Sequence, residues 1–156
     1  MRGAVLVVLL AVLGCRRVPG PAADAWLQVR NVTLAFPAEE QGDLFFEVEL
    51  PPNVIRAASA KWELWLSGRR FAEGVLMAPP TMTDGSGVRR LRIEAPLAWK
   101  HLGWRDGAQF LDVGVRGEVM PWGAPEGTRL PFRSRTQVLV TGAPRLDDGT
   151  LDAVAR

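Results

Sequence analysis

Apolar and polar residues alternate along most of this chain, a pattern typical of β-strands that turn one face toward a core. The segment 44–50 reads LFFEVEL, so every even-numbered residue is apolar and two of the odd-numbered residues are glutamates. The segment 60–66 reads AKWELWL and alternates in the same way. Its two expected faces are Trp62, Leu64 and Leu66 on one side and Lys61, Glu63 and Trp65 on the other. Both segments therefore predict half-buried strands.

Seven such segments follow one another, separated by clusters of Gly, Pro, Asn and Asp that favour turns. They are residues 26–36, 44–50, 60–66, 70–77, 88–95, 108–120 and 129–141. A change of phase near Arg30 and Asn31 indicates a β-bulge. Short strands with frequent turns favour an all-β sandwich over a parallel sheet.

One segment departs from the alternation. In residues 96–106, apolar side chains recur at helical spacing, Pro96 suits a helix start and Gly107 a helix stop. We therefore expect one short helix there. We also expect two apolar faces to meet across the sheets, about 10 Å apart. These faces are Trp62, Leu64 and Leu66 on one strand and Leu111, Val113 and Val115 on the other.

The start of the chain has a different character. Met1 and Arg2 precede ten consecutive apolar residues, 4–13, which as a helix would rise about 15 Å, half the thickness of a bilayer core. This length fits the core of a signal peptide better than a permanent membrane span. The alternative is a buried core helix that happens to carry a thiol.

The residues that follow the apolar run, Val12-Leu13-Gly14-Cys15, resemble the lipobox of bacterial lipoproteins. The resemblance implies that the Cys15 thiol receives diacylglycerol and that the chain is cut before Cys15. It also implies that Arg16, where Asp would signal inner-membrane retention, sends the protein to the outer membrane, facing the periplasm.

These features predict four parts along the chain. Residues 1–14 are a lipoprotein signal peptide, 15–25 the lipidated cysteine and a short tether, 26–141 the β domain, and 142–156 a polar C-terminal tail. The tether contains Pro19, Gly20 and Pro21, and its residues 16–24 reach about 30 Å when fully extended. The domain is therefore expected close to a membrane surface, as a monomer.

Charge and cysteine content exclude several classes of function. The chain has 19 Lys and Arg and 17 Asp and Glu, a net charge of +2 that becomes +1 after loss of Arg2. Nucleic-acid binding needs a more concentrated basic surface, so no nucleic-acid partner is expected. Cys15 is the only cysteine, which excludes an intrachain disulfide and a thiolate zinc site.

The sequence predicts no catalytic residue, no metal and no cofactor. His101 is the only histidine, and a catalytic or metal-bound histidine would need partners. Surface contact is the remaining candidate, because Trp65 shares its strand with the inward-facing Trp62 and must point elsewhere. The candidate contact residues are Trp65, Arg69, Arg70, Arg89, Arg90 and Arg92. The arginines form either a solvated strand face or a contact with anionic lipid headgroups.

Six stretches resemble the late-embryogenesis-abundant type 2 family, also called the water-stress and hypersensitive-response domain. They are residues 29–34 (VRNVTL), 46–53 (FEVELPPN), 62–68 (WELWLSG), 71–74 (FAEG), 113–119 (VGVRGEV) and 130–132 (LPF). The resemblance implies an immunoglobulin- or fibronectin-III-like sandwich of about seven strands with one short helix. It also implies a non-catalytic role in tolerance of desiccation or other stress.

Two other functions stay open at this point. One is a β-sandwich binding module that acts as accessory to an envelope protein complex. The other is an envelope hydrolase, which the sequence favours least because no acid–base pair stands out. Fold alone does not decide between them.

Overall fold

The computed structural model describes residues 25–100, 102–146 and 153–155. Within these ranges the protein is all-β, with nine strands and no helix. The strands are β1 (Val29–Ala38), β2 (Gln41–Glu49), β3 (Ala57–Leu66), β4 (Arg69–Met77), β5 (Thr81–Thr83), β6 (Arg89–Ala98), β7 (Trp104–Pro121), β8 (Leu130–Pro144) and β9 (Ala153–Ala155). Seven of them are long and correspond to the seven predicted segments.

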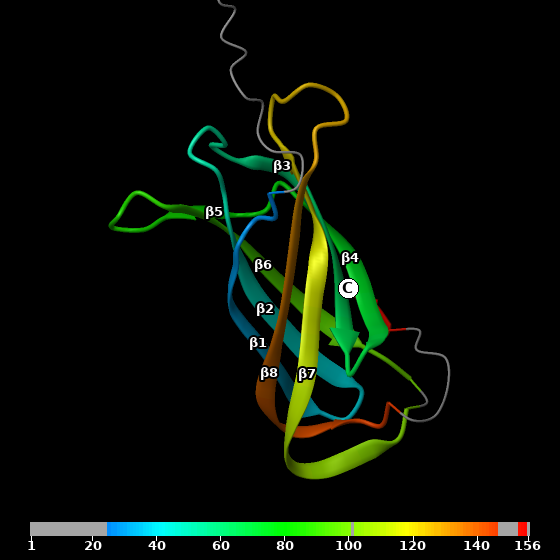
Figure 1. Cartoon of the computed structure of the whole chain (residues 1–156). Helices are drawn as coiled ribbons and strands as arrows, with labels where there is room; N and C mark the ends of the chain where they lie inside the picture. Colours follow the sequence, from blue (N-terminus) through cyan, green and yellow to red (C-terminus); the bar gives the residue numbers. More distant parts are fainter. Residues whose placement is uncertain (1–24, 101, 147–152, 156) are drawn as a thin grey trace, which may run out of the picture.

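The long strands form two antiparallel sheets. The first sheet has the order β1-β2-β6, with β5 attached to β6, and the second has the order β4-β3-β7-β8. In Figure 1, β7 and β8 lie in front of β1, β2 and β6. The short strand β9 pairs with β6 and with β4, and a bridge between Leu27 and Phe132 joins the opposite edges. The two sheets are thus joined on both sides.

The core lies between the two sheets, and every buried side chain of the described core is apolar. The ring centroids of Phe46, from the first sheet, and Phe132, from the second, are 5.7 Å apart. On β3 the predicted inward face is confirmed, because Trp62, Leu64 and Leu66 are at most 2% exposed. Lys61, on the opposite face, is exposed. The alternation of segment 60–66 therefore gives the correct register.

The predicted helix over 96–106 is wrong. Strand β6 continues through Ala98, and β7 begins at Trp104. Burial keeps its period of two, because Ala95, Leu97 and Trp99 are buried while Pro96 is exposed. A proline suits a helix start, but here it occupies a strand position opposite Asp43. Leu97 and Trp104, which stand at helical spacing in the sequence, belong to two different strands.

The predicted meeting of two apolar faces across the sheets is also wrong. Strands β3 and β7 are neighbours in the same sheet, with Leu64 opposite Val115 and Leu66 opposite Val113. Both sets are buried, as predicted, but side by side. Alternation shows which face is buried and carries no information about which strands pair, so the error lies in the strand order.

Strand boundaries differ modestly from those predicted. The bulge near Arg30 and Asn31 is confirmed, since the β1–β2 register shifts between Arg30 and Thr33 and Asn31 has φ of 52°. Strand β8 runs to Pro144, three residues beyond the predicted domain boundary at 141. Strand β9 lies within the segment predicted as a polar tail. Part of that segment therefore belongs to the sheet structure.

Candidate interaction surface

The predicted lipidation residues, Val12, Leu13, Gly14 and Cys15, lie outside the described residues. A backbone hydrogen bond nevertheless fixes the position at which the described chain enters the domain. The Leu27 amide donates a hydrogen bond to the Pro131 carbonyl oxygen at 2.8 Å, beside the β7–β8 connection. Any tether that precedes Ala25 therefore joins the domain at this end.

The predicted surface residues fall into two groups that lie far apart. Trp65, Arg69 and Arg70 flank the β3–β4 turn, whereas the other three arginines lie on β6. Because β9 pairs with Ala72 of β4 and with Leu97 of β6, the β3–β4 turn lies beside the far end of β6. Arg90 is seven residues from Leu97, a distance of about 23 Å along a strand. The candidate arginines therefore do not form one combined basic cluster.

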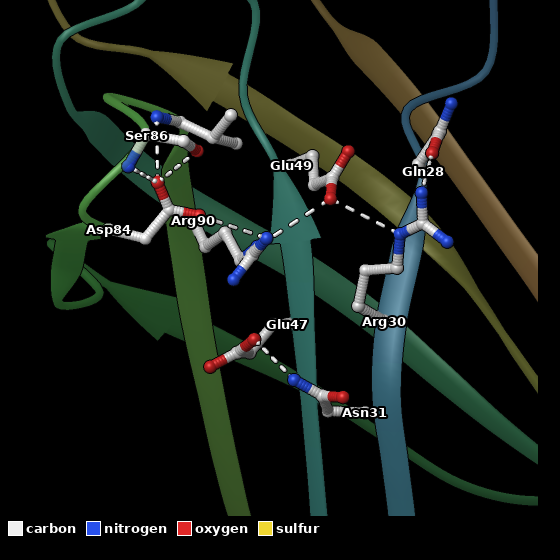
Figure 2. A network of polar contacts seen from close by, with 9 residues as sticks. Gln28, Arg30, Asn31, Glu47, Glu49, Asp84, Ser86 and Arg90 are labelled. Atoms are coloured by element: carbon white, nitrogen blue, oxygen red, sulfur yellow. Dashed lines mark hydrogen bonds and ion pairs between the residues drawn. The ribbon is translucent and has the colours of Figure 1, made fainter.

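On the first sheet, Arg90 lies within a network of polar contacts (Figure 2). Its guanidinium lies 3.0 Å from an Asp84 oxygen and 3.5 Å from a Glu49 oxygen. Glu49 also binds Arg30 at 3.2 Å, and the Asn31 amide donates to Glu47 at 2.8 Å. The charge of Arg90 is thus balanced by two carboxylates of the same chain.

Asp84 is held by the hairpin that connects β5 and β6. One of its oxygens accepts hydrogen bonds from the Ser86 hydroxyl at 2.6 Å, the Ser86 amide at 2.9 Å and the Val88 amide at 3.1 Å. The hydrogen bond from the Ser86 side chain, followed by those from the two amides and the Arg90 charge, holds the pKa of Asp84 below its usual range. This is the geometry of a turn, which favours a structural role.

The remaining predicted arginines also have partners within the chain. Arg89 donates to the Pro52 carbonyl oxygen at 2.9 Å, and Arg92 pairs with Glu94. Arg70 binds Glu73 at 3.1 Å, and Arg69 donates to the Leu146 carbonyl oxygen. These contacts favour the solvated strand face over a headgroup-binding cluster.

Trp65 belongs to a different surface, the outer face of the second sheet. Its indole nitrogen donates to Glu63 at 3.0 Å, and the Arg116 guanidinium lies 4.3 Å from the ring centroid. Gly114 is its register partner on β7 and presents no side chain there. On the same face, the Arg133 guanidinium lies 4.6 Å from the Trp26 ring centroid. We call Trp26, Trp65, Arg116 and Arg133 the Arg–Trp face.

Sequence reasoning identified Trp65 but missed the two arginines of this face. The signal was present, because Arg116 and Arg133 occupy outward positions of the alternating segments 108–120 and 129–141. What the sequence did not provide was their register, which places Arg116 between Glu63 and Arg133. Stacking of a guanidinium on a ring depends on that cross-strand placement.

Scans against protein-family models and searches among curated proteins and solved structures found no match to this chain. In the part of the chain that the structure describes, no group of three or more His, Cys, Asp or Glu side chains could hold a metal ion. No helix in the same residues is long and apolar enough to cross a membrane. The described outer faces carry Arg–Trp stacking and ion pairs.

The contribution of the Glu63 carboxylate to the stability of the Arg–Trp face depends on pH. Desolvation alone would raise its pKa, but hydrogen bonds from Arg116 and Trp65 outweigh that effect and hold the pKa below 4.5. A carboxylate with a lowered pKa stabilises the fold above the pKa of the unfolded chain and loses this contribution as pH falls through the folded value. The stabilisation is therefore present at neutral pH and is lost as pH falls through the lowered pKa of Glu63.

Glu63→Gln is expected to lower the free energy of unfolding by less than about 1 kcal/mol near neutral pH, since Arg116 is largely exposed. The difference between the variant and the wild type should shrink as pH falls well below 4.5. Urea melts of both proteins across that range test this. A difference that stays constant with pH would show that the hydrogen bonds to Glu63 do not depend on its charge.

Proposed function

We propose that this protein is an envelope lipoprotein, anchored through lipid on Cys15 at the outer membrane and facing the periplasm. The apolar run 4–13 followed by Gly14 and Cys15 supports the anchor. The described chain begins at the end where the β7–β8 connection lies, and residues 16–24 would link it to the anchor over at most about 30 Å. The domain is then held at the bilayer by one defined end.

The fold type that we propose is the fibronectin-III-like or immunoglobulin-like sandwich. The orders β1-β2-β6 and β4-β3-β7-β8 are what that fold gives when its strands are taken as A-B-E and C′-C-F-G. Trp62, buried on β3, occupies the strand that carries a core tryptophan in immunoglobulin domains. The chain has no tyrosine, so it lacks the tyrosine corner of that fold.

Within this fold we propose membership of the late-embryogenesis-abundant type 2 family and a non-catalytic role in stress protection. One observation carries the role: charged side chains on both outer faces bind partners within the chain, as Arg90 and Arg116 do. Ion pairs strengthen when the surrounding dielectric falls, as it does when water is removed. A surface with matched charges therefore keeps its contacts on drying.

Loss of the anchor should abolish this function. Cells that lack the protein are expected to survive drying poorly, and wild-type protein should restore survival whereas Cys15→Ala should not. Restoration by an unanchored Cys15→Ala protein would contradict a role at the envelope. Equal survival with and without the protein would contradict the protective role.

The anchor itself has a direct test. Cys15→Ala removes the thiol that receives diacylglycerol, so we expect an unprocessed precursor that takes up no labelled palmitate. The wild-type chain should be labelled and recovered in the outer-membrane fraction. Normal processing of Cys15→Ala would contradict the lipobox assignment, and wild-type protein found only in the inner membrane would contradict the proposed location.

A second candidate function is a binding module that serves an envelope protein complex. The Arg–Trp face favours it, because Trp and Arg are both enriched at the centres of protein–protein interfaces. A pull-down of the acylated protein from envelope extract separates the two functions. One stoichiometric partner that is lost with Arg116→Ala but kept with Lys61→Ala supports the module, and the absence of any partner supports the protectant.

A further inference from the structure

We propose that the end of the domain where the chain begins is a membrane-docking surface that enters the interface of a lipid bilayer. Three connections form this end: residues 51–56 between β2 and β3, 78–88 around β5, and 122–129 between β7 and β8. In Figure 1 the connections 51–56 and 122–129 lie at the top, and the hairpin around β5 projects to the left just below them. We call them the loop end.

Each connection of the loop end presents one large apolar side chain to solvent. Ile55 is 72% exposed, Met82 53% and Trp122 58%. Two more exposed side chains, Met77 and Met120, flank Ser59 in the row of residues directly below the connections. None of these side chains belongs to the buried core of the domain.

Contacts between the connections hold this surface together. The Trp122 amide donates to the Arg56 carbonyl oxygen at 3.0 Å, and the Arg56 guanidinium lies 4.4 Å from the Trp122 ring centroid. Arg89 donates to Pro52 at 2.9 Å, which ties residues 51–56 to β6. A tryptophan beside an arginine is an amphipathic pair, suited to the boundary between acyl chains and headgroups.

Two observations select a bilayer over another occupant. First, the described chain starts at this end, so the tether 16–24 would attach the anchor proposed for Cys15 beside the loop end. Second, the loop end carries two basic and two acidic residues, Arg56, Arg129, Asp84 and Glu126. Asp84 and Arg129 are also paired with Arg90 and Glu118 of the adjoining strands. The contact should therefore be apolar and aromatic and depend little on anionic lipid or salt, unlike a headgroup-binding arginine cluster.

The inference rests on the proposed membrane attachment but is tested separately from lipidation. The full chain carrying Cys15→Ser has no native thiol, and the apolar run 4–13 is expected to hold it in vesicles of phosphatidylethanolamine and phosphatidylglycerol. Ile55→Cys and Phe110→Cys are then made in this background and labelled with an environment-sensitive fluorophore. Phe110 is a matched control, since it is 70% exposed and lies on β7 about 33 Å along the strand from Met120.

We expect the label at position 55 to shift to shorter wavelength and to be quenched by bromine-labelled lipid, at low and at high salt. The label at 110 should keep its aqueous spectrum and be quenched by iodide. Iodide quenching of equal strength at both positions would overturn the proposal, as would shielding of position 55 only when envelope proteins are added, which would indicate a protein partner. Palmitate labelling of the wild-type chain reports on the anchor whichever result is obtained.

Discussion

Trp62→Ala is expected to destabilise the domain by about 3–5 kcal/mol, through lost burial of the indole and the cavity left behind. Trp62 is 2% exposed and lies at the centre of β3, which pairs on both sides, with β4 and with β7. Single domains have a free energy of unfolding of about 5–15 kcal/mol, so the variant should come close to unfolding. Urea melts followed by circular dichroism measure the change.

Lys61→Ala is the matched control for that experiment, because Lys61 is the neighbouring residue and is exposed. It should change the free energy of unfolding by about 0.5 kcal/mol or less. Glu63, also on the outer face, is a poorer control, since it accepts hydrogen bonds from Trp65 and Arg116. A larger loss from Lys61→Ala than from Trp62→Ala would mean that the register of β3 is shifted by one residue.

The second large effect is expected at Gly117, which lies opposite Trp62 on β7. A Cβ atom at Gly117 would lie 2.0 Å from the Lys61 carbonyl oxygen and 2.6 Å from the Phe132 ring. The backbone oxygen cannot yield without moving β3, so Gly117→Ala should cost about 1–3 kcal/mol or more. Thermal or urea melts would show this as a lower midpoint.

Gly85→Ala provides the comparison for this variant. A Cβ atom at Gly85 would meet nothing within 4 Å, and the residue lies in the exposed hairpin that connects β5 and β6. Replacing a flexible glycine by alanine restricts the unfolded chain, so Gly85→Ala should be neutral or slightly stabilising, by about 0.4–1 kcal/mol at most. If Gly117→Ala were equally harmless, the close approach of β3 and β7 at this point would be wrong.

These two sites show what the sequence could and could not establish. The burial of Trp62 follows from alternation alone, because a strand has a fixed period of two. The reason for a glycine at 117 does not, since it depends on how closely β7 approaches β3 and on Phe132 of β8. Gly117 appears in the sequence only as a residue that weakens a strand. Long-range contacts give it its role.

The predicted helix over 96–106 failed for a related reason. Pro96 and Gly107 are ordinary helix boundaries, and residues 97–104 contain apolar side chains at helical spacing. Pairing with β2 fixes residues 96–98 as strand all the same, with Leu97 opposite Gly42. Tertiary pairing overrides local preference in such short segments. The surface arginines show the same limit. Alternation places each arginine on an outer face, but it does not identify the carboxylates or rings that the arginine contacts.

The strand β9 has a consequence for how the protein can be handled. Its three residues pair with Ala72 and Glu73 of β4 and with Leu97 and Ala98 of β6, and so occupy a seam between two strand edges. Without β9 those edges would present free backbone groups, next to exposed Val75 and Met77 on β4. Free strand edges beside apolar side chains promote pairing between molecules. Trimming the C-terminal residues would therefore threaten solubility before stability, and an affinity tag is better placed where it leaves β9 undisturbed.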